Sequence, residues 1–292
     1  MPGGDRPLVT RSRRLLAIDL DGTLLDASGL PHARDVKAVR AALAAGVSVT
    51  IVTGRLYSGS RAAAEVLGLR GAVGCADGSH VVLASDHTTL LHCGVRGDDA
   101  LALRRALVNA KAATFVFAKD AIGHDSAGTP YVGYMSTWST DVRIATDVFE
   151  HDLWAAEEGV TAVVALGPRE SLEQAVRELE RDAPGDVFVA LFPLRRGPHG
   201  GTWAVMVRAG AVTKGTAVRW IAEREGVSLQ DTVCVGDWIN DIPMFEVAGR
   251  SFAMGQAPDE VKSKATDVLT ETAESGGGVA SAVERAFGIG VD

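Results

Sequence analysis

The segment LLAIDLDGTLLD, from Leu15 to Asp26, constrains the fold more than any other part of the chain. Its short and almost unbroken apolar run is typical of a strand that is buried on both faces, as in a parallel sheet. The run ends in two carboxylates, Asp19 and Asp21, which are costly to bury unless a positive charge balances them. The sequence therefore predicts a parallel sheet with a charged site at the carboxyl end of its first strand.

Apolar runs and helical segments alternate at both ends of the chain. In chain order these segments are 31–46, 47–54, 58–68, 71–76, 213–226, 231–237 and 240–249. Strand and helix in alternation with short connections predict a doubly wound parallel sheet. We therefore expect an α/β, Rossmann-like core that is built from residues 1–84 and 202–292.

The middle of the chain, residues 85–201, has a different pattern. Two segments have helical periodicity and four have the composition of strands; the helical ones are 98–112 and 169–183, and the strand-like ones are 113–118, 129–136, 160–167 and 186–192. This mixture predicts a separate α+β layer. We interpret it as an inserted α+β cap domain.

Composition excludes several classes of protein. The chain has 292 residues, of which 47% are hydrophobic, and a formal net charge of -8. Nucleic-acid binding usually requires a basic excess, so it is disfavoured. No stretch approaches the ~20 apolar residues of a membrane helix, and the three cysteines show no CxxC spacing. We expect a cytoplasmic protein with neither a membrane nor a nucleic acid as partner.

Polar residues follow each predicted core strand at its carboxyl end, where parallel α/β sheets bind ligands. Asp19 and Asp21 follow the first strand, Thr53, Gly54 and Arg55 the second, and Asp237, Asn240 and Asp241 the late strand, while Lys214 begins the helix before it. Clustered carboxylates favour a hard divalent cation such as Mg²⁺. A carboxylate can attack phosphorus, and a second carboxyl can move the proton.

Each of these features is weak evidence by itself. An Asp-Gly pair between apolar runs is often only a hairpin turn, and the segment GDWIND could be an ordinary turn in which Asp237 or Asn240 caps a helix. The ordered occurrence of all of them, at three strand ends and one helix start, is the specific signal.

The sequence resembles the haloacid dehalogenase-like (HAD) phosphatase superfamily, in particular its Cof-type branch with an inserted C2-type cap. DLDGT matches the first motif of that superfamily, Thr53 in IVTGR the second, Lys214 in VTKG the third and GDWINDIPM the fourth. The tail FAMGQAPDEVKSKATDVL is also similar to that branch. The resemblance covers the two core segments, whereas the cap matches only in position, length and α+β content.

The resemblance implies a role for each matching residue. Asp19 would be the nucleophile, and Asp21 would be the general acid/base whose backbone carbonyl also binds the metal. The implied Mg²⁺ ligands are Asp19, Asp21 and Asp237, with Asp241 supporting the metal site or Lys214. The implied phosphate-binding residues are Leu20, Thr53, Gly54, Lys214 and Asn240.

Departures from the family pattern, and residues of the cap, are candidates for substrate contacts. Asp77-Gly78-Ser79 stands where the branch often has Asn-Gly-Ala, and Trp238 stands where a smaller or polar residue is common. The full set of candidate substrate or cap contacts is Arg55, Asp77, Gly78, Tyr131, Tyr134, Trp138, Arg195 and Trp238. Packing is an equal or better explanation for Trp238 and for each cap residue.

We therefore predict a Mg²⁺-dependent phosphomonoester hydrolase that acts through an aspartyl phosphate on a small phosphorylated metabolite, and we expect a sugar phosphate. Two alternatives stay open. The same carboxylates would serve a phosphomutase, and the fold could serve a non-catalytic regulator that binds a sugar phosphate. The sequence does not set the oligomeric state, and it leaves a homodimer open beside a monomer.

Overall fold

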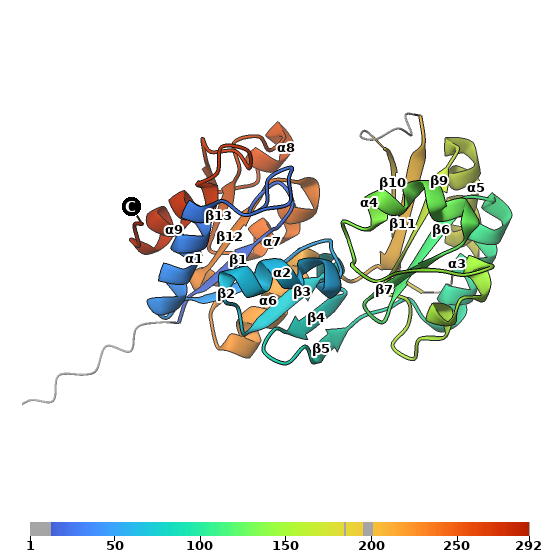
Figure 1. Ribbon diagram of the computed structural model, residues 1–292, viewed down its shortest axis with the longest axis horizontal. Helices are drawn as coiled ribbons and strands as arrows, with labels where there is room; N and C mark the ends of the chain where they lie inside the picture. The colour runs from blue at the N-terminus through green and yellow to red at the C-terminus, as the bar shows by residue number, and fades with distance from the viewer. Residues whose placement is uncertain (1–12, 184, 195–200, 292) are drawn as a thin grey trace, which may run out of the picture.

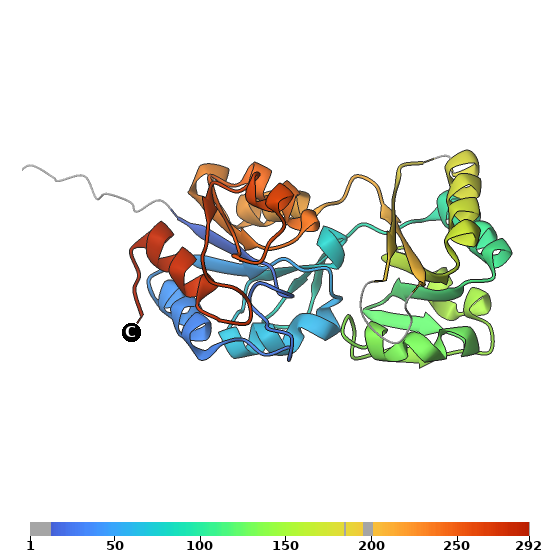
Figure 2. The ribbon, with the colours of Figure 1, turned by 90° about the horizontal axis from the view of Figure 1, so that it is seen from above.

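The computed structural model describes residues 13–183, 185–194 and 201–291. It has two lobes joined by two connecting segments (Figure 1, Figure 2). One lobe, the core, contains both ends of the described chain, and the other, the cap, is formed by its middle. The predicted α/β core with an inserted α+β cap is confirmed.

The core is built on a parallel sheet with strand order β14-β13-β12-β1-β2. Its strands are β1 (Leu15–Ile18), β2 (Ser48–Ile51), β12 (Thr232–Gly236), β13 (Arg250–Ala253) and β14 (Asp267–Val268). The chain builds outward from β1 in one direction and later continues on its other side, so β1 lies at the switch point where such sheets bind ligands. Asp19 follows β1 directly.

Helices cover both faces of this sheet. Alternate residues of β1 point to opposite faces, so each face contributes apolar side chains to a separate cluster. Leu16 and Ile18 join one apolar cluster, with the helices α1 (Ala33–Ala44), α2 (Tyr57–Leu67) and α9 (Gly278–Phe287). Ala17 joins a second cluster on the other face, with α6 (Lys214–Glu225) and α7 (Ile242–Val247). The short helix α8 (Asp259–Lys262) follows β13. This burial on both faces explains the unbroken apolar pattern of β1.

A three-stranded sheet extends the core toward the cap. It consists of β3 (Ala72–Cys75), β4 (His80–Leu83) and β5 (Thr89–His92), which pair antiparallel. A single parallel bridge between Val52 and Gly74 joins it to the end of β2. β4 and β5 were not predicted from the sequence, because no α-helix separates their short apolar runs from β3 or from each other.

The cap is a six-stranded sheet of order β10-β11-β9-β6-β7-β8. Its strands are β6 (Ala113–Ala118), β7 (Ala121–His124), β8 (Val142–Ile144), β9 (Ala162–Gly167), β10 (Val187–Pro193) and β11 (Trp203–Ala209). The helices α3 (Gly97–Ala110) and α5 (Arg169–Asp182) pack on one face. The other face, with α4 (Val132–Met135), packs against Leu56 and Ala76 of the core.

Strand pairing favours domain boundaries that differ from those expected. β5 lies beyond residue 84 but pairs with β4 of the core, and β11 lies beyond residue 201 but pairs with β9 and β10 of the cap. We propose a cap of about residues 93–209. The strand predicted at 129–136 was wrong: the 3₁₀ helix Ser126–Tyr131 and α4 occupy it, and the Asp125 carboxylate caps the 3₁₀ helix by accepting from Ala127 N–H.

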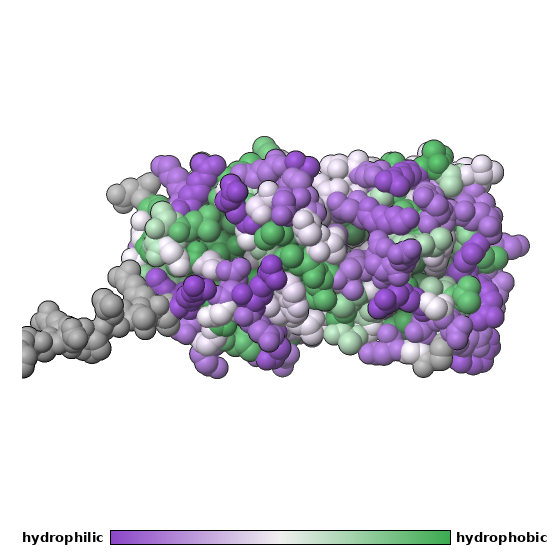
Figure 3. Space-filling model, turned by 90° about the horizontal axis from the view of Figure 1, so that it is seen from below, coloured by the Kyte–Doolittle hydropathy of each residue, from purple (hydrophilic) through white to green (hydrophobic). Residues whose placement is uncertain are grey.

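Among the described residues, no helix is both long and apolar enough to cross a membrane. Hydrophilic residues dominate the cap half of the face in Figure 3, where apolar residues form only small separate patches. Scattered apolar residues of this kind are normal on a protein surface.

Candidate active site

Three carboxylates meet at the carboxyl ends of β1 and β12. Asp19, Asp237 and Asp241 each offer an oxygen atom, and these atoms lie within 4.8 Å of one another. Asp19 and Asp237 follow the two strands directly, and the parallel register of β1 with β12 brings their ends together. Asp241 comes from the 3₁₀ helix Ile239–Asp241, directly after the turn that follows β12. The predicted convergence of strand ends is therefore present.

Lys214 supplies a positive charge to this cluster. Its Nζ donates to Asp19 Oδ1 and to Asp241 Oδ1, both at 2.6 Å, and its side chain is almost fully buried. Lys214 is the first residue of α6, and Thr213 caps that helix through a reciprocal bond with Thr216. Burial by itself would lower the pKa of Lys214, but Asp19 and Asp241 outweigh it and raise the pKa above the usual range.

Asp241 organises the turn around the cluster. Its Oδ2 accepts from the backbone N–H groups of Asp237 and Trp238, at 2.8 and 2.9 Å. Its other oxygen is held by Lys214. Asp241 thus holds both Lys214 and the backbone of the turn, which suits it to position its neighbours. Asp19 and Asp237 follow the strand ends directly and stay the candidate metal ligands.

Two residues that the sequence analysis did not single out hold Asp237. Thr23 Oγ1 donates to Asp237 Oδ1 at 3.2 Å, and Gln256 Nε2 donates to Asp237 Oδ2 at 3.3 Å and to the carbonyl of Gly22. Gly22 has a φ of +84°, and a Cβ there would lie 2.4 Å from Asp237 Oδ2. The role of Gln256 could not be predicted from local sequence, because Gln256 is far from Gly22 in the chain.

The donor set fits a divalent cation. Burial, then the Asp241 carboxylate, raises the pKa of Asp237 to about 6, and burial raises the pKa of Asp19 well above its usual range. The three carboxylates and one ammonium leave an excess of negative charge in a buried place. Carboxylate oxygens with that charge are suited to Mg²⁺, and a bound cation would lower both pKa values.

Asp21 lies apart from the buried cluster. Its side chain is 57% exposed, and Arg55 binds both of its oxygens, with Nε to Oδ2 at 2.8 Å. Arg55 thus contacts the proposed acid rather than standing free for a substrate. The Asp-Gly pair does not form an ordinary hairpin turn: Asp21 and Leu25 form a parallel bridge, and the Leu20 carbonyl accepts from the N–H groups of residues 23–25 in a tight loop. The Leu20 side chain is buried.

The third-strand residues lie beside the phosphate-binding candidates. Asp77 N–H donates to the Thr53 carbonyl, and Asn240 Nδ2 donates to Asp77 Oδ1 at 2.9 Å. A Cβ on Gly54 would lie 3.5 Å from the same oxygen. Asp77 therefore links the ends of β2 and β12, although its own φ is +54°. Gly78, with a φ of +100°, allows the Thr213 carbonyl to approach closely.

The cap candidates divide into three groups. Tyr134 is 38% exposed and close enough to Asp21 that this carboxylate raises the tyrosine pKa, after burial itself. Trp138 packs its ring against Tyr134 and Phe117, and Tyr131 packs in the apolar layer between cap and core. Arg195 lies outside the described residues. Trp238, in the core, is half exposed next to Asp237.

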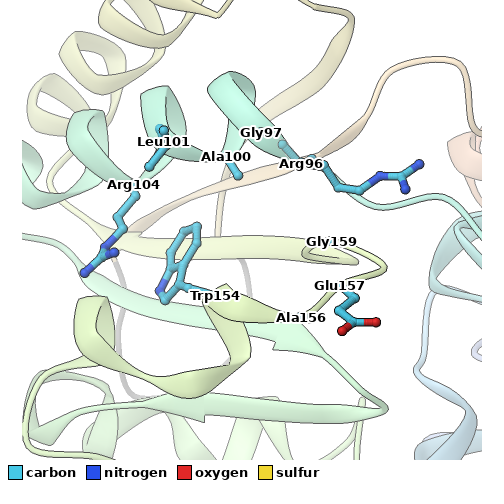
Figure 4. A pocket seen from close by; sticks show the side chains of 10 residues that line it. Arg96, Gly97, Ala100, Leu101, Arg104, Trp154, Ala156, Glu157 and Gly159 are labelled. Atoms are coloured by element: carbon cyan, nitrogen blue, oxygen red, sulfur yellow. The ribbon is translucent and has the colours of Figure 1, made fainter.

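A cavity of about 360 Å³ lies elsewhere, in the cap. It lies between the start of α3 and the segment that runs from the 3₁₀ helix Asp152–Ala155 to Gly159. The guanidinium groups of Arg96 and Arg104 extend away from each other at its rim (Figure 4). None of the candidate active-site residues lines it. We therefore take the carboxylate cluster, and not this cavity, as the candidate active site.

The whole chain resembles known proteins. The description of the matching family is haloacid dehalogenase-like hydrolase, and the match spans residues 16–283. A phosphoglycolate phosphatase of Methanothermobacter thermautotrophicus is 25% identical over 94% of this chain and 99% of its own length. A 5-amino-6-(5-phospho-D-ribitylamino)uracil phosphatase of Bacillus subtilis is 26% identical over 90% of this chain and 95% of its own.

The fold also matches solved structures. A haloacid dehalogenase-like hydrolase of Bacteroides thetaiotaomicron superposes with a TM-score of 0.79 at 20% sequence identity. The match covers 94% of this chain and 100% of that one, so it includes both the core and the cap.

Proposed function

The chain belongs to the haloacid dehalogenase-like hydrolase family, and we propose that it is a Mg²⁺-dependent phosphomonoester hydrolase that works through an aspartyl phosphate on Asp19. The observation that supports this most is the buried Asp19–Lys214–Asp241 arrangement. It keeps the Asp19 carboxylate at the switch point of the sheet, fixed by the Lys214 ammonium group, and Asp237, whose pKa is raised, lies beside it. The relatives described above are phosphatases.

In the first half of the proposed reaction, an oxygen of Asp19 attacks the phosphorus atom of the substrate. The ester bond to the leaving oxygen breaks, and Asp21 gives that oxygen its proton. Lys214 fixes Asp19 and balances charge on the transferring group, and Thr53, Gly54 and Asn240 provide hydrogen bonds to the phosphoryl oxygens.

In the second half, Asp21 takes a proton from water as the water oxygen attacks phosphorus. The bond between phosphorus and Asp19 breaks, so that inorganic phosphate and the free carboxylate are formed. Asp19, Asp237 and the backbone carbonyl of Asp21 are the proposed ligands of Mg²⁺, which when bound would neutralise charge on the phosphoryl oxygens. Asp241 acts on this site only by orienting Lys214 and the turn.

We propose a small phosphorylated metabolite as the substrate, with a sugar or sugar-alcohol phosphate as its class. Tyr134 and Trp138 of the cap form a pair of rings in tilted contact near Asp21, and aromatic faces suit the flat or apolar side of such a leaving group. A leaving group as small as glycolate would leave these rings without a partner. The ribityl phosphate in the name of the Bacillus relative agrees with this class.

The test is a panel of phosphorylated metabolites assayed with Mg²⁺ for release of inorganic phosphate. The panel includes phosphoglycolate, hexose and pentose phosphates, and phosphorylated sugar alcohols with and without a ring. We expect highest kcat/KM for a sugar or sugar-alcohol phosphate, and preference for phosphoglycolate would contradict the substrate class. Isomerisation of a hexose 1-phosphate would identify a mutase instead, and tight binding without turnover would identify a regulator.

A further inference from the structure

The helix α2 links the cap to the proposed acid. It begins two residues after Arg55, which holds Asp21. Arg55 is itself held by this region, because its backbone N–H donates to Thr53 Oγ1 at 3.2 Å and its Nη1 donates to the Gly59 carbonyl at 3.1 Å. A shift of the first turn of α2 would therefore move the guanidinium that orients Asp21.

The N-terminus of α2 has no capping group of its own. Its N-cap residue is Leu56, which has no side-chain hydrogen bond to the helix, and the first N–H groups of a helix need acceptors from elsewhere. Those acceptors come from the cap. Asp120 Oδ1 accepts from Ser58 N–H at 3.0 Å, and the Trp138 carbonyl accepts from Leu56 N–H at 2.9 Å. A carboxylate is the preferred acceptor at this place.

Side-chain contacts around Ser58 tighten this junction. Ser58 Oγ donates to the Asp120 carbonyl at 3.0 Å and lies 2.8 Å from Ser139 Oγ, and Ser139 is fully buried. Gly59 lets the Trp138 carbonyl come close, since a Cβ there would lie 2.4 Å from that oxygen. The start of α2 and the cap are thus closely complementary in shape, and these hydrogen bonds exist only while the cap is in contact with the core.

The backbone of Asp120 is also specialised. Lys119 and Asp120 form the two-residue turn between β6 and β7, and both have positive φ, +50° and +58°. Such turns usually contain Asn or Gly, and non-glycine residues with positive φ are concentrated at functional places. The turn projects Asp120 toward α2, whereas Lys119 is exposed.

We propose that Asp120 is a positioning residue, which couples contact between cap and core to the orientation of the general acid. With the cap in contact, Asp120 completes the first turn of α2, and through Arg55 it sets Asp21 for proton transfer. With the cap away, α2 lacks its capping carboxylate and Asp21 loses that control. This inference rests on the proposed role of Asp21 and adds a residue to it.

The test compares two substrates that differ in their need for an acid. An alkyl phosphate needs a proton on its leaving oxygen, whereas 2,4-dinitrophenyl phosphate does not, because its leaving group is a stable anion. We expect Asp120→Ala to lower kcat/KM for the alkyl phosphate by ~10- to 100-fold and for the dinitrophenyl ester by less than ~3-fold. Asp120→Asn, which keeps an acceptor oxygen, should recover part of the loss.

Lys119→Ala is the matched control, because it changes the other positive-φ residue of the same turn and should leave both rates unchanged. Equal losses on both substrates, or no loss, would overturn the proposal. A wild type without activity on either ester would instead contradict the proposed function. In that case hydrogen exchange decides: we expect faster exchange at the Ser58 amide in Asp120→Ala but not in Lys119→Ala, and unchanged exchange would overturn the coupling.

Discussion

At the scale of single residues, the site depends on how closely backbone and carboxylate approach each other. Gly22 is the clearest case, because its lack of a Cβ makes room for Asp237. The glycine in DLDGT is therefore required by contact with a residue more than two hundred positions away. Because Asp237 can approach the Gly22 backbone this closely, it also lies within hydrogen-bonding distance of Thr23 and Gln256.

We predict that Gly22→Ala lowers activity and Mg²⁺ affinity, because an added Cβ would displace the Asp237 carboxylate. Gly29→Ala is a matched control, since Gly29 also has a positive φ, +78°, but has no atom within 4 Å of an added Cβ. Both variants carry the ~1 kcal/mol strain of a positive φ, and only Gly22→Ala adds ~1–3 kcal/mol of overcrowding. Titration of Mg²⁺ binding in both variants would measure this, and equal affinities would contradict it.

Removal of the metal should make stability depend on pH through Asp237. Its pKa of about 6 in the folded state exceeds the usual 3.8, so between these values the folded state binds more protons than the unfolded state. Stability without metal therefore falls as pH rises through this window, by ~3 kcal/mol in total. We expect Mg²⁺ to raise the free energy of unfolding more at pH 8 than at pH 5, and Asp237→Asn to reduce the difference, because Asp19, whose pKa is also raised, still titrates.

At the scale of elements, each functional residue lies at an end of a strand or helix. Asp19 and Asp237 follow β1 and β12, Lys214 begins α6, and Thr213 caps that helix. The capping bonds fix the direction in which Lys214 leaves the helix. The first turn of α6 is thus part of the site, although Thr213 itself contacts none of the carboxylates in the described hydrogen bonds.

Thr213→Ala should cost ~1 kcal/mol in the free energy of unfolding, because it removes the capping hydroxyl. It should also lower kcat, because Lys214 would then be less well oriented between Asp19 and Asp241. Thr213→Ser keeps the hydroxyl and should restore both quantities. Urea denaturation and steady-state kinetics measure the two effects. A loss of stability without any change in kcat would show that the N-cap hydroxyl of Thr213 does not help to position Lys214.

The elements and residues that local patterns specify were predictable from the sequence. The strands before Asp19 and Asp237 and the start of α6 were predicted because their apolar runs and end residues are contiguous. The roles of Gln256 and Asp120 were not, because their partners are distant in the chain. The segment 129–136 was mistaken for a strand because its aromatic residues have strand propensity, while Pro130 and the capping Asp125 favoured helical turns.

At the scale of the whole molecule, the cap contacts the core next to Thr53 and Gly54, which we propose to bind phosphate. Leu56 and Ala76 of the core are buried against the cap sheet, and Gly59 packs against the Trp138 carbonyl. Substrate binding is therefore expected to depend on how often the two lobes are in contact. A substitution at this junction should therefore change activity although it leaves the buried cluster of Asp19, Asp237 and Asp241 unaltered.

Gly59→Ala should disfavour contact between the lobes, because its Cβ would lie 2.4 Å from a backbone oxygen. Overcrowding of ~1–3 kcal/mol, present only with the lobes in contact, would lower kcat/KM by ~10- to 100-fold. Gly133→Ala is the control, as an added Cβ there has no neighbour within 4 Å. Small-angle scattering should show a more open Gly59→Ala protein, and unchanged kcat/KM would contradict this view of the junction.

The central claim is that Asp19 is the nucleophile of a Mg²⁺-dependent phosphatase. Its most direct measurement is acid quenching of the enzyme during turnover of a good substrate, followed by mass spectrometry of the peptides. We predict one phosphoryl group on Asp19, present with Mg²⁺, absent with EDTA and absent in Asp19→Asn, which should also lose activity by at least ~10³-fold. A phosphoryl group on another residue, or full activity in Asp19→Asn, would contradict the claim.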